Sequence, residues 1–107
     1  MREVTIILPM RDNTGATLKS ERLTIESTLL TLASGFTREL VSGVWTAANG
    51  RRHMDRSYRY DVICSNMVAH SLREAASGWA SLLRQDVLYY GDRSANVHFI
   101  APLSTVA

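Results

Sequence analysis

The densest mixture of chemically useful side chains lies between Trp45 and Tyr60. An aromatic ring there could stack on a heterocycle such as adenine, a guanidinium could hold a carboxylate, and a carboxylate could hold a cation. We therefore take this stretch as the first candidate for a binding site. The alternative is an ordinary exposed hairpin whose charges are solvated. The functional side chains are Trp45, Arg51, Arg52, His53, Asp55, Arg56, Tyr58, Arg59 and Tyr60.

A second candidate is the run Tyr89-Tyr90-Gly91-Asp92-Arg93, where an acidic side chain lies beside a predicted turn at 91–93. The competing interpretation of this run is a plain sheet edge. No other feature of the run favours chemistry over structure.

The remaining reactive residue types form no recognisable motif. His53, His70 and His98 are too dispersed for a zinc site, and Cys64 lies in an apolar strand pattern that favours a core position over a nucleophile. The segment 12–15 resembles the start of a calcium loop, but the later ligands are missing and a turn is favoured. Phosphate-binding and nucleophile-elbow motifs are absent. We therefore expect neither a metal nor a cofactor.

Composition limits the class of protein. A chain of 107 residues that is 46% hydrophobic and 21% charged is typical of one globular domain, which we place at 1–101 with a frayed tail at 102–107. The lone cysteine excludes an internal disulfide, and no apolar run approaches the roughly 18 residues of a membrane span, so we expect a cytoplasmic protein. A net charge of +2 gives no reason to expect nucleic acid as a partner.

Hydrophobic periodicity and turn signals predict the elements that must position these side chains. We expect Gly35 to end the first helix and Asn49-Gly50 to form a hairpin turn. Gly43, inside the second strand, indicates a bulge or a close approach of the backbone. The first helix is expected to bury a stripe of Leu23, Ile25, Leu29, Leu30 and Leu32. The patterns predict strands at 4–8, 36–47, 57–64, 85–90 and 95–100, and helices at 20–33 and 66–84.

This order of elements is β-α-β-β-α-β with an extra short strand near the C-terminal end. It predicts a ferredoxin-like α+β sandwich, in which both helices cover one face of an antiparallel sheet. The strand aromatics exceed what one layer of helices needs, so we expect the open face to pack in a homo-oligomer. These aromatics are Trp45, Tyr58, Tyr60, Tyr89 and Phe99.

The succession of short motifs resembles two groups of proteins. One is a bacterial family of small uncharacterised domains that share the spaced glycine, Gly-x-Trp and acid-x-Ser elements. The other is the S-adenosylmethionine (SAM) lyases that bacteriophages use against host restriction, and this resemblance extends over most of the chain. The motifs that carry it are the strand at 4–9, Gly35-Phe36-Thr37, Gly43-Val44-Trp45, Asn49-Gly50, the segment 55–62, a helix ending in Trp79, and Val87-Leu88-Tyr89.

The resemblance to SAM lyases implies a trimer of ferredoxin-like subunits with active sites at the subunit interfaces. It also implies a reaction that yields methylthioadenosine and homoserine lactone, in which the carboxylate of the substrate attacks its own γ-carbon. Such a reaction needs no protein nucleophile and no metal. The protein would then act in the cytoplasm of a host cell.

The same resemblance assigns roles to particular residues. Asp55 and Tyr58 would position the substrate, Trp45 or Tyr60 would pack against the adenine, and Arg52 would contribute to substrate binding. The lyases carry a glutamate near the start of the third strand, whereas the segment 54–61 contains no glutamate and Asp55 is its nearest acid.

Two other functions compete with the lyase. One is a non-catalytic oligomeric binding or inhibitor module, from a phage or mobile element, that acts on a host protein through the exposed sheet. The other is a nucleic-acid binder that uses Arg51, Arg52, Arg56 and Arg59, for which we expect a steep dependence of affinity on salt.

Overall fold

Alternation of apolar and polar side chains along the first strand determines which face of the sheet is covered. In β1 (Arg2–Pro9), Val4, Ile6 and Leu8 are fully buried, and the residues between them face the other side. The computed structural model describes residues 1–93 and 97–103. Its elements are β1, α1 (Lys19–Ala33), β2 (Thr37–Thr46), β3 (Arg52–Cys64), α2 (Asn66–Leu82), β4 (Leu88–Asp92) and β5 (Val97–Ile100).

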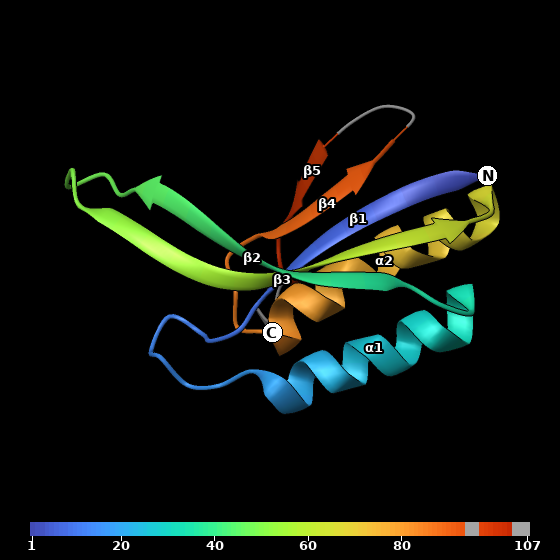
Figure 1. The fold of residues 1–107 in the computed structure, drawn as a ribbon, viewed down its shortest axis with the longest axis horizontal. Coiled ribbons are helices and arrows are strands. Elements are labelled where there is room, and N and C mark those ends of the chain that lie inside the picture. The colour runs from blue at the N-terminus through green and yellow to red at the C-terminus, as the bar shows by residue number, and fades with distance from the viewer. Residues whose placement is uncertain (94–96, 104–107) are drawn as a thin grey trace.

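These elements form the predicted ferredoxin-like α+β sandwich. The five strands are all antiparallel to their neighbours, in the order β2-β3-β1-β4-β5, and both helices lie on one face of the sheet (Figure 1). Within the described residues, no helix is long and apolar enough to cross a membrane.

The second helix follows its sequence pattern closely. Ser65 caps α2 by accepting a hydrogen bond from the backbone N–H of Val68, and Leu72, Ala76 and Trp79 are buried against the sheet. The amino end of the predicted tail is attached to this helix, because the N–H of Leu103 donates to the side-chain oxygen of Ser81 at 2.9 Å. The rest of the tail, 104–107, lies outside the described residues.

The first helix departs from its predicted stripe. Ile25 and Leu29 are buried together with Arg22, whereas Leu23, Leu30 and Leu32 are exposed. The helix ends at Ala33 as predicted, but Ser34 instead of Gly35 adopts the left-handed conformation, at φ 68°. The N–H of Ser34 donates to the carbonyl of Leu30 and so stabilises this end.

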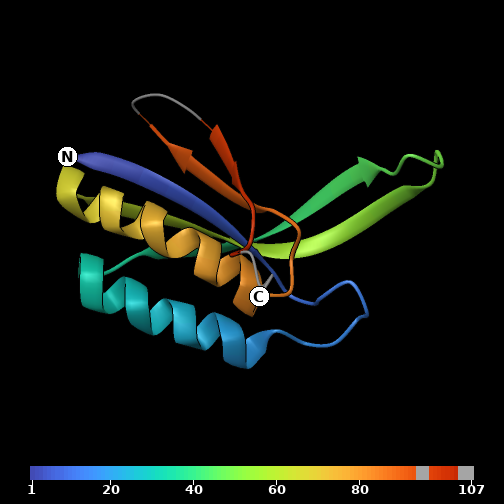
Figure 2. The ribbon, with the colours of Figure 1, turned by 180° about the vertical axis from the view of Figure 1, so that it is seen from behind.

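The hairpin of β2 and β3 is longer than predicted. The polar segment 52–56 belongs to β3, and pairing with β2 is regular from Thr37↔Asp61 to Thr46↔Arg52. The register passes through Gly43↔Asp55 without interruption, so the predicted bulge at Gly43 is wrong. The Asn49-Gly50 turn is confirmed, with Gly50 at φ 81°. Beyond the helices the hairpin continues as a projecting two-stranded ribbon, residues 42–56, which we call the arm (Figures 1 and 2).

The C-terminal strands are shifted relative to their predicted bounds. Gly91 and Asp92 belong to β4 and do not form the predicted turn. The start of the predicted fifth strand, 95–96, lies outside the described residues, and so do the side chains of His98 and Phe99.

Candidate functional site

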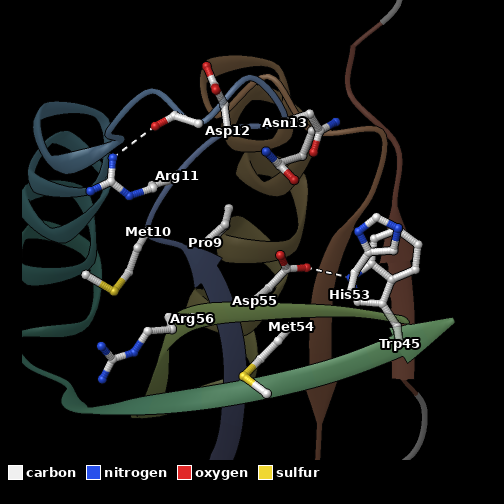
Figure 3. Close-up of a pocket in the computed structure, with 12 residues that line it drawn as sticks. Pro9, Met10, Arg11, Asp12, Asn13, Trp45, His53, Met54, Asp55 and Arg56 are labelled. Carbon is white, nitrogen blue, oxygen red and sulfur yellow. Dashed lines mark hydrogen bonds between the residues drawn. The ribbon is translucent and has the colours of Figure 1, made fainter. Parts of the chain in front are cut away.

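A cleft of about 670 Å³ lies between the arm and the loop that joins β1 to α1 (Figure 3). Its walls come from three places that are far apart in the sequence: the end of β1 with the following loop, the arm, and the connection between α2 and β4. The residues that line it are Pro9, Met10, Arg11, Asp12, Asn13, Gly15, Trp45, His53, Met54, Asp55, Arg56 and Gln85.

Trp45, His53 and Asp55 form the arm side of the cleft. Trp45 and His53 are direct cross-strand partners, and their rings stack with centroids 4.5 Å apart and planes 17° apart. Asp55 lies two residues along β3, on the same face, and its Oδ2 accepts a hydrogen bond from the indole Nε1 of Trp45 at 2.6 Å. Trp45 is 50% exposed, so its ring presents a flat apolar surface beside a carboxylate (Figure 3).

The opposite wall is a turn organised by Asp12. Its Oδ1 accepts hydrogen bonds from the backbone N–H of Thr14 and Ala16 and from the hydroxyl of Thr14, at 2.7–2.9 Å. This arrangement confirms that the segment 12–15 is a turn. Among the described residues, no group of three or more potential metal ligands comes together.

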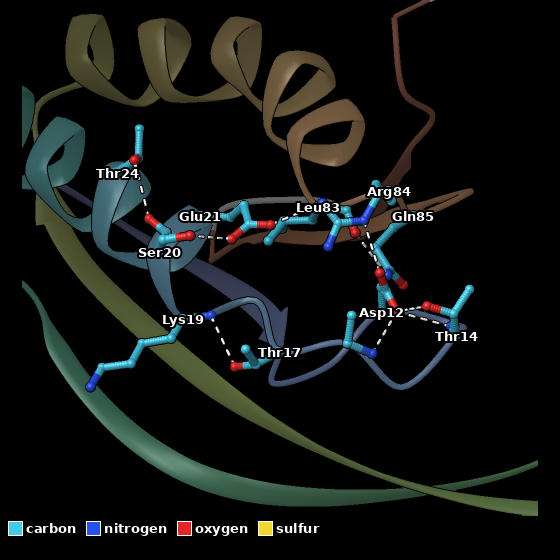
Figure 4. A network of polar contacts seen from close by, with 11 residues as sticks. Asp12, Thr14, Thr17, Lys19, Ser20, Glu21, Thr24, Leu83, Arg84 and Gln85 are labelled. Carbon is cyan, nitrogen blue, oxygen red and sulfur yellow. Dashed lines mark hydrogen bonds and ion pairs between the residues drawn. The ribbon is translucent and has the colours of Figure 1, made fainter.

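Arg84 attaches this turn to both helices. Its Nε donates to Asp12 Oδ2 at 2.8 Å and its Nη1 donates to Glu21 Oε2 at 2.9 Å (Figure 4). The hydrogen bonds from Thr14 and Arg84 hold the pKa of Asp12 well below its ordinary value. The pKa of Glu21 is also lowered, first by the hydroxyl of Ser20 and then by its own backbone N–H and Arg84.

The two tyrosines of the candidate stretch lie on the other face of β3. The ring of Tyr58 lies between the guanidinium groups of Arg22 and Arg38, at 5.0 and 4.9 Å. Tyr58 and Asp55 therefore do not meet within one chain. Successive side chains of a strand point to opposite faces, so residues 55 and 58, three positions apart, lie on different faces of β3. The proposed role of Tyr58 in positioning substrate finds no support in the geometry of a single chain.

Tyr60 is a core residue, and its predicted contact with adenine is wrong for the folded chain. The side chain is fully buried, and its hydroxyl donates to Glu26, which also accepts from Arg38. Burial, and then the charge and hydrogen bond of Glu26, raise the pKa of Tyr60 above its ordinary value. Fewer strand aromatics therefore lie on the open face than the sequence predicts, because Tyr60 and the half-buried Tyr58 face the helices.

The arginines of the candidate stretch are separated. Arg52 and Arg56 share the helix-side face of the arm by register, and Arg52 does not line the cleft. Arg59 lies on the open face, where it pairs with Glu39 at 2.6 Å. A single basic surface made of these side chains, as nucleic-acid binding requires, is not present.

The other candidates from the sequence are structural. Cys64 is buried, and burial raises the pKa of its thiol. His70 is exposed and pairs with Glu74 at 3.0 Å. In the run 89–93, Tyr90 is buried and its hydroxyl donates to the carbonyl of Ala69, which favours the interpretation of this run as ordinary sheet.

Sequence reasoning missed the wall opposite the arm. Asn13 and Gln85 both line the cleft, yet neither belongs to a motif with a chemical role. The available signal was the Asp12-x-Thr14 turn directly after a buried strand, because such turns place side chains at the edge of a sheet. Gln85 could not be found this way, since nothing local links it to residue 12.

The fold of the chain is shared with two groups of solved structures. A phage SAM lyase in complex with S-methyl-5′-thioadenosine aligns at a TM-score of 0.65 and 11% identity, covering 94% of this chain and 88% of the lyase chain. A phage SAM lyase in the apo state aligns at 0.68 and 12% identity, covering 98% and 92%.

CutA from Pyrococcus horikoshii aligns at a TM-score of 0.60 and 15% identity, covering 100% of this chain and 88% of the CutA chain. No protein-family model matches the chain, and no curated protein matches it either. At these identities the likeness to the solved structures establishes the fold.

Proposed function

We propose that this protein is a SAM lyase of the bacteriophage type, which cleaves SAM to methylthioadenosine and homoserine lactone as a counter-defence against host restriction. The observation that carries the proposal is the cleft that combines the stacked Trp45 and His53 rings with the Asp55 carboxylate. SAM has the matching groups, a flat adenine and a positively charged ammonium group. A solved protein with the same fold was found with S-methyl-5′-thioadenosine bound.

The reaction needs geometry more than it needs reactive side chains. The substrate carboxylate forms a C–O bond to its own γ-carbon while the bond from that carbon to sulfur breaks. The sulfur keeps the bonding pair and becomes a neutral thioether, and the new ester closes the lactone, so no proton is transferred. The task of the cleft is to fold the substrate so that carboxylate, carbon and sulfur are in line.

Asp55 is suited to hold the ammonium group of the substrate. The positive charge on sulfur diminishes as the C–S bond breaks, so a carboxylate beside the sulfur would stabilise the ground state more than the transition state. The ammonium charge does not change during the reaction. A carboxylate that pairs with it keeps the ammonium away from the attacking carboxylate and leaves that nucleophile free. Trp45 holds one oxygen of Asp55, so the orientation of the carboxylate is fixed before substrate binds.

The test is turnover by the purified protein. SAM is incubated with the protein, and methylthioadenosine and homoserine lactone are followed by chromatography. We expect both products, and we expect Asp55→Asn to raise KM and lower kcat. Glu74→Gln, which removes an exposed carboxylate far from the cleft, is the matched control and should leave turnover unchanged. Absence of turnover at high protein concentration would exclude the lyase and favour the non-catalytic binding module.

We also propose that the functional unit is a homo-oligomer, with a trimer favoured. The arm projects beyond the helices and exposes Val44 and Met54 at 64% and 73%. By register they lie on the face of the arm opposite Trp45, His53 and Asp55, although Met54 also lines the cleft. Two exposed apolar side chains that are adjacent across the strands suit contact with a second copy of the chain. Light scattering should give a multiple of the monomer mass, and Met54→Glu should reduce it. Met67→Glu, at an exposed methionine on α2, is the control, and a monomeric wild type would refute the proposal.

A further inference from the structure

Asn13 presents a side chain to the cleft from a fixed backbone, without using that side chain in a hydrogen bond to any other described residue. Asn13 lines the cleft and its carboxamide makes no hydrogen bond within the described part of the chain. The backbone on either side of it is fixed, because the N–H of Asp12 donates to the backbone carbonyl of Ala16 at 2.9 Å and the N–H of Gly15 donates to the backbone carbonyl of Asp12 at 3.0 Å. The turn therefore presents a free carboxamide from a rigid support.

The neighbouring polar groups are occupied by the turn itself. Both carboxylate oxygens of Asp12 accept hydrogen bonds, from Thr14, Ala16 and Arg84, and the hydroxyl of Thr14 donates to Asp12. Arg11 donates to the carbonyl of Gly15. Of the side chains that the turn presents to the cleft, the carboxamide of Asn13 has both its donor and its acceptor free for a ligand.

We propose that Asn13 determines specificity by binding the polar edge of the adenine ring that stacks on Trp45. A carboxamide offers one donor and one acceptor side by side, and adenine offers the complementary pair on its edge. Because the turn is already rigid, little conformational entropy is lost when the contact forms. This inference rests on the proposed function, which supplies the adenine.

Arg84 is the positioning residue in this arrangement. Its backbone has φ 56°, in the left-handed region where a glycine is less strained. The ion pairs of its side chain with Asp12 and Glu21 offset that strain, and they connect the end of α2 to the turn that carries Asn13 (Figure 4). Arg84 thus acts on the ligand only through the position of the turn.

The test compares two ligands by calorimetry, methylthioadenosine and its analogue without the 6-amino group. We expect the wild type to bind methylthioadenosine with about tenfold higher affinity than the analogue, the discrimination that one good pair of hydrogen bonds to a base edge gives. This affinity ratio is the quantity compared among the variants. Asn13→Ala breaks no internal hydrogen bond and should bring the ratio close to one. Asn66→Ala, at an asparagine that contacts Arg2 instead, is the control and should keep the full ratio.

The outcomes separate this inference from the proposed function. If Asn13→Ala keeps the tenfold ratio, the role of Asn13 is refuted while the lyase proposal stands. If the wild type binds neither compound, both fail. Arg84→Met should reduce the ratio, and Arg84→Lys should restore part of it. A purely structural arginine would instead lower the melting temperature and leave the ratio unchanged.

Discussion

Replacing Tyr60 by Phe separates a role in stability from a role in substrate binding. The substitution removes only the hydroxyl that donates to Glu26, and the ring keeps its edge contact with Phe36 at 5.3 Å. A hydrogen bond to a charged acceptor contributes about 1.5–3 kcal/mol. Because Arg38 still donates to Glu26 in the variant, we expect the lower end of that range, about 1.5 kcal/mol.

For a domain of this size such a loss lowers the melting temperature by about 6–12 °C. The measurement is thermal and urea unfolding followed by circular dichroism. Tyr90→Phe is the matched comparison, because the hydroxyl of Tyr90 donates to the uncharged carbonyl of Ala69. Its loss should be smaller, about 1 kcal/mol. Turnover at 25 °C should be unchanged in Tyr60→Phe, since the side chain does not reach the cleft.

Alkaline pH adds a second readout. The pKa of Tyr60 is raised in the folded state above its ordinary value of 10.0. The neutral hydroxyl therefore contributes its full stabilisation below pH 10, and this stabilisation is lost as the pH rises toward the folded-state pKa. The stability of Tyr60→Phe should therefore fall less steeply above pH 10 than that of the wild type. An unchanged melting temperature, or a loss of turnover in a fully folded variant, would refute the assignment of Tyr60 to the core.

Three further predictions concern the turn and the arm. Because the pKa of Asp12 is lowered by folding, its ionised carboxylate stabilises the fold above pH 3.8, and this stabilisation is lost as the pH falls through the folded-state pKa. The free energy of unfolding of Asp12→Asn should therefore decline less steeply in acid than that of the wild type. Gly50→Ala forces φ 81° on a residue with a side chain and should cost about 1 kcal/mol in urea unfolding. Gly43→Val should strengthen the arm but lower turnover, because it crowds the directly paired Asp55. Gly43→Ala, whose Cβ meets nothing within 4 Å, should keep turnover, and equal activity of all three proteins would count against the cleft.

The elements that were predicted well are those whose signal is local. The apolar strand at 4–8, the start of the second helix at residue 66 and the buried Cys64 follow from the residues themselves. The first helix was predicted less well, because its leucines exceed the surface that the sheet offers it. Arg22 occupies part of that surface, where its guanidinium packs over Tyr58, and Leu23 and Leu30 are left exposed.

The arm was missed for a different reason. Residues 52–56 lack the apolar alternation by which strands are recognised, because neither face of this segment is covered by a helix. What makes them a strand is their backbone pairing with β2, a long-range interaction that no window of sequence reports.

Whether Trp45 and Asp55 meet depends on one residue of loop length. The Asn49-Gly50 signal is usually that of a two-residue loop, which would pair Trp45 with residue 54 and place Asp55 on the opposite face. The structure instead closes on Ala47 and Arg51, with Gly50 as the left-handed third residue of the loop. That single added residue pairs Trp45 with 53 and brings the indole N–H to the carboxylate of Asp55. The composition of the site was therefore readable in the sequence, but its assembly on one face was decided by the conformation of Gly50.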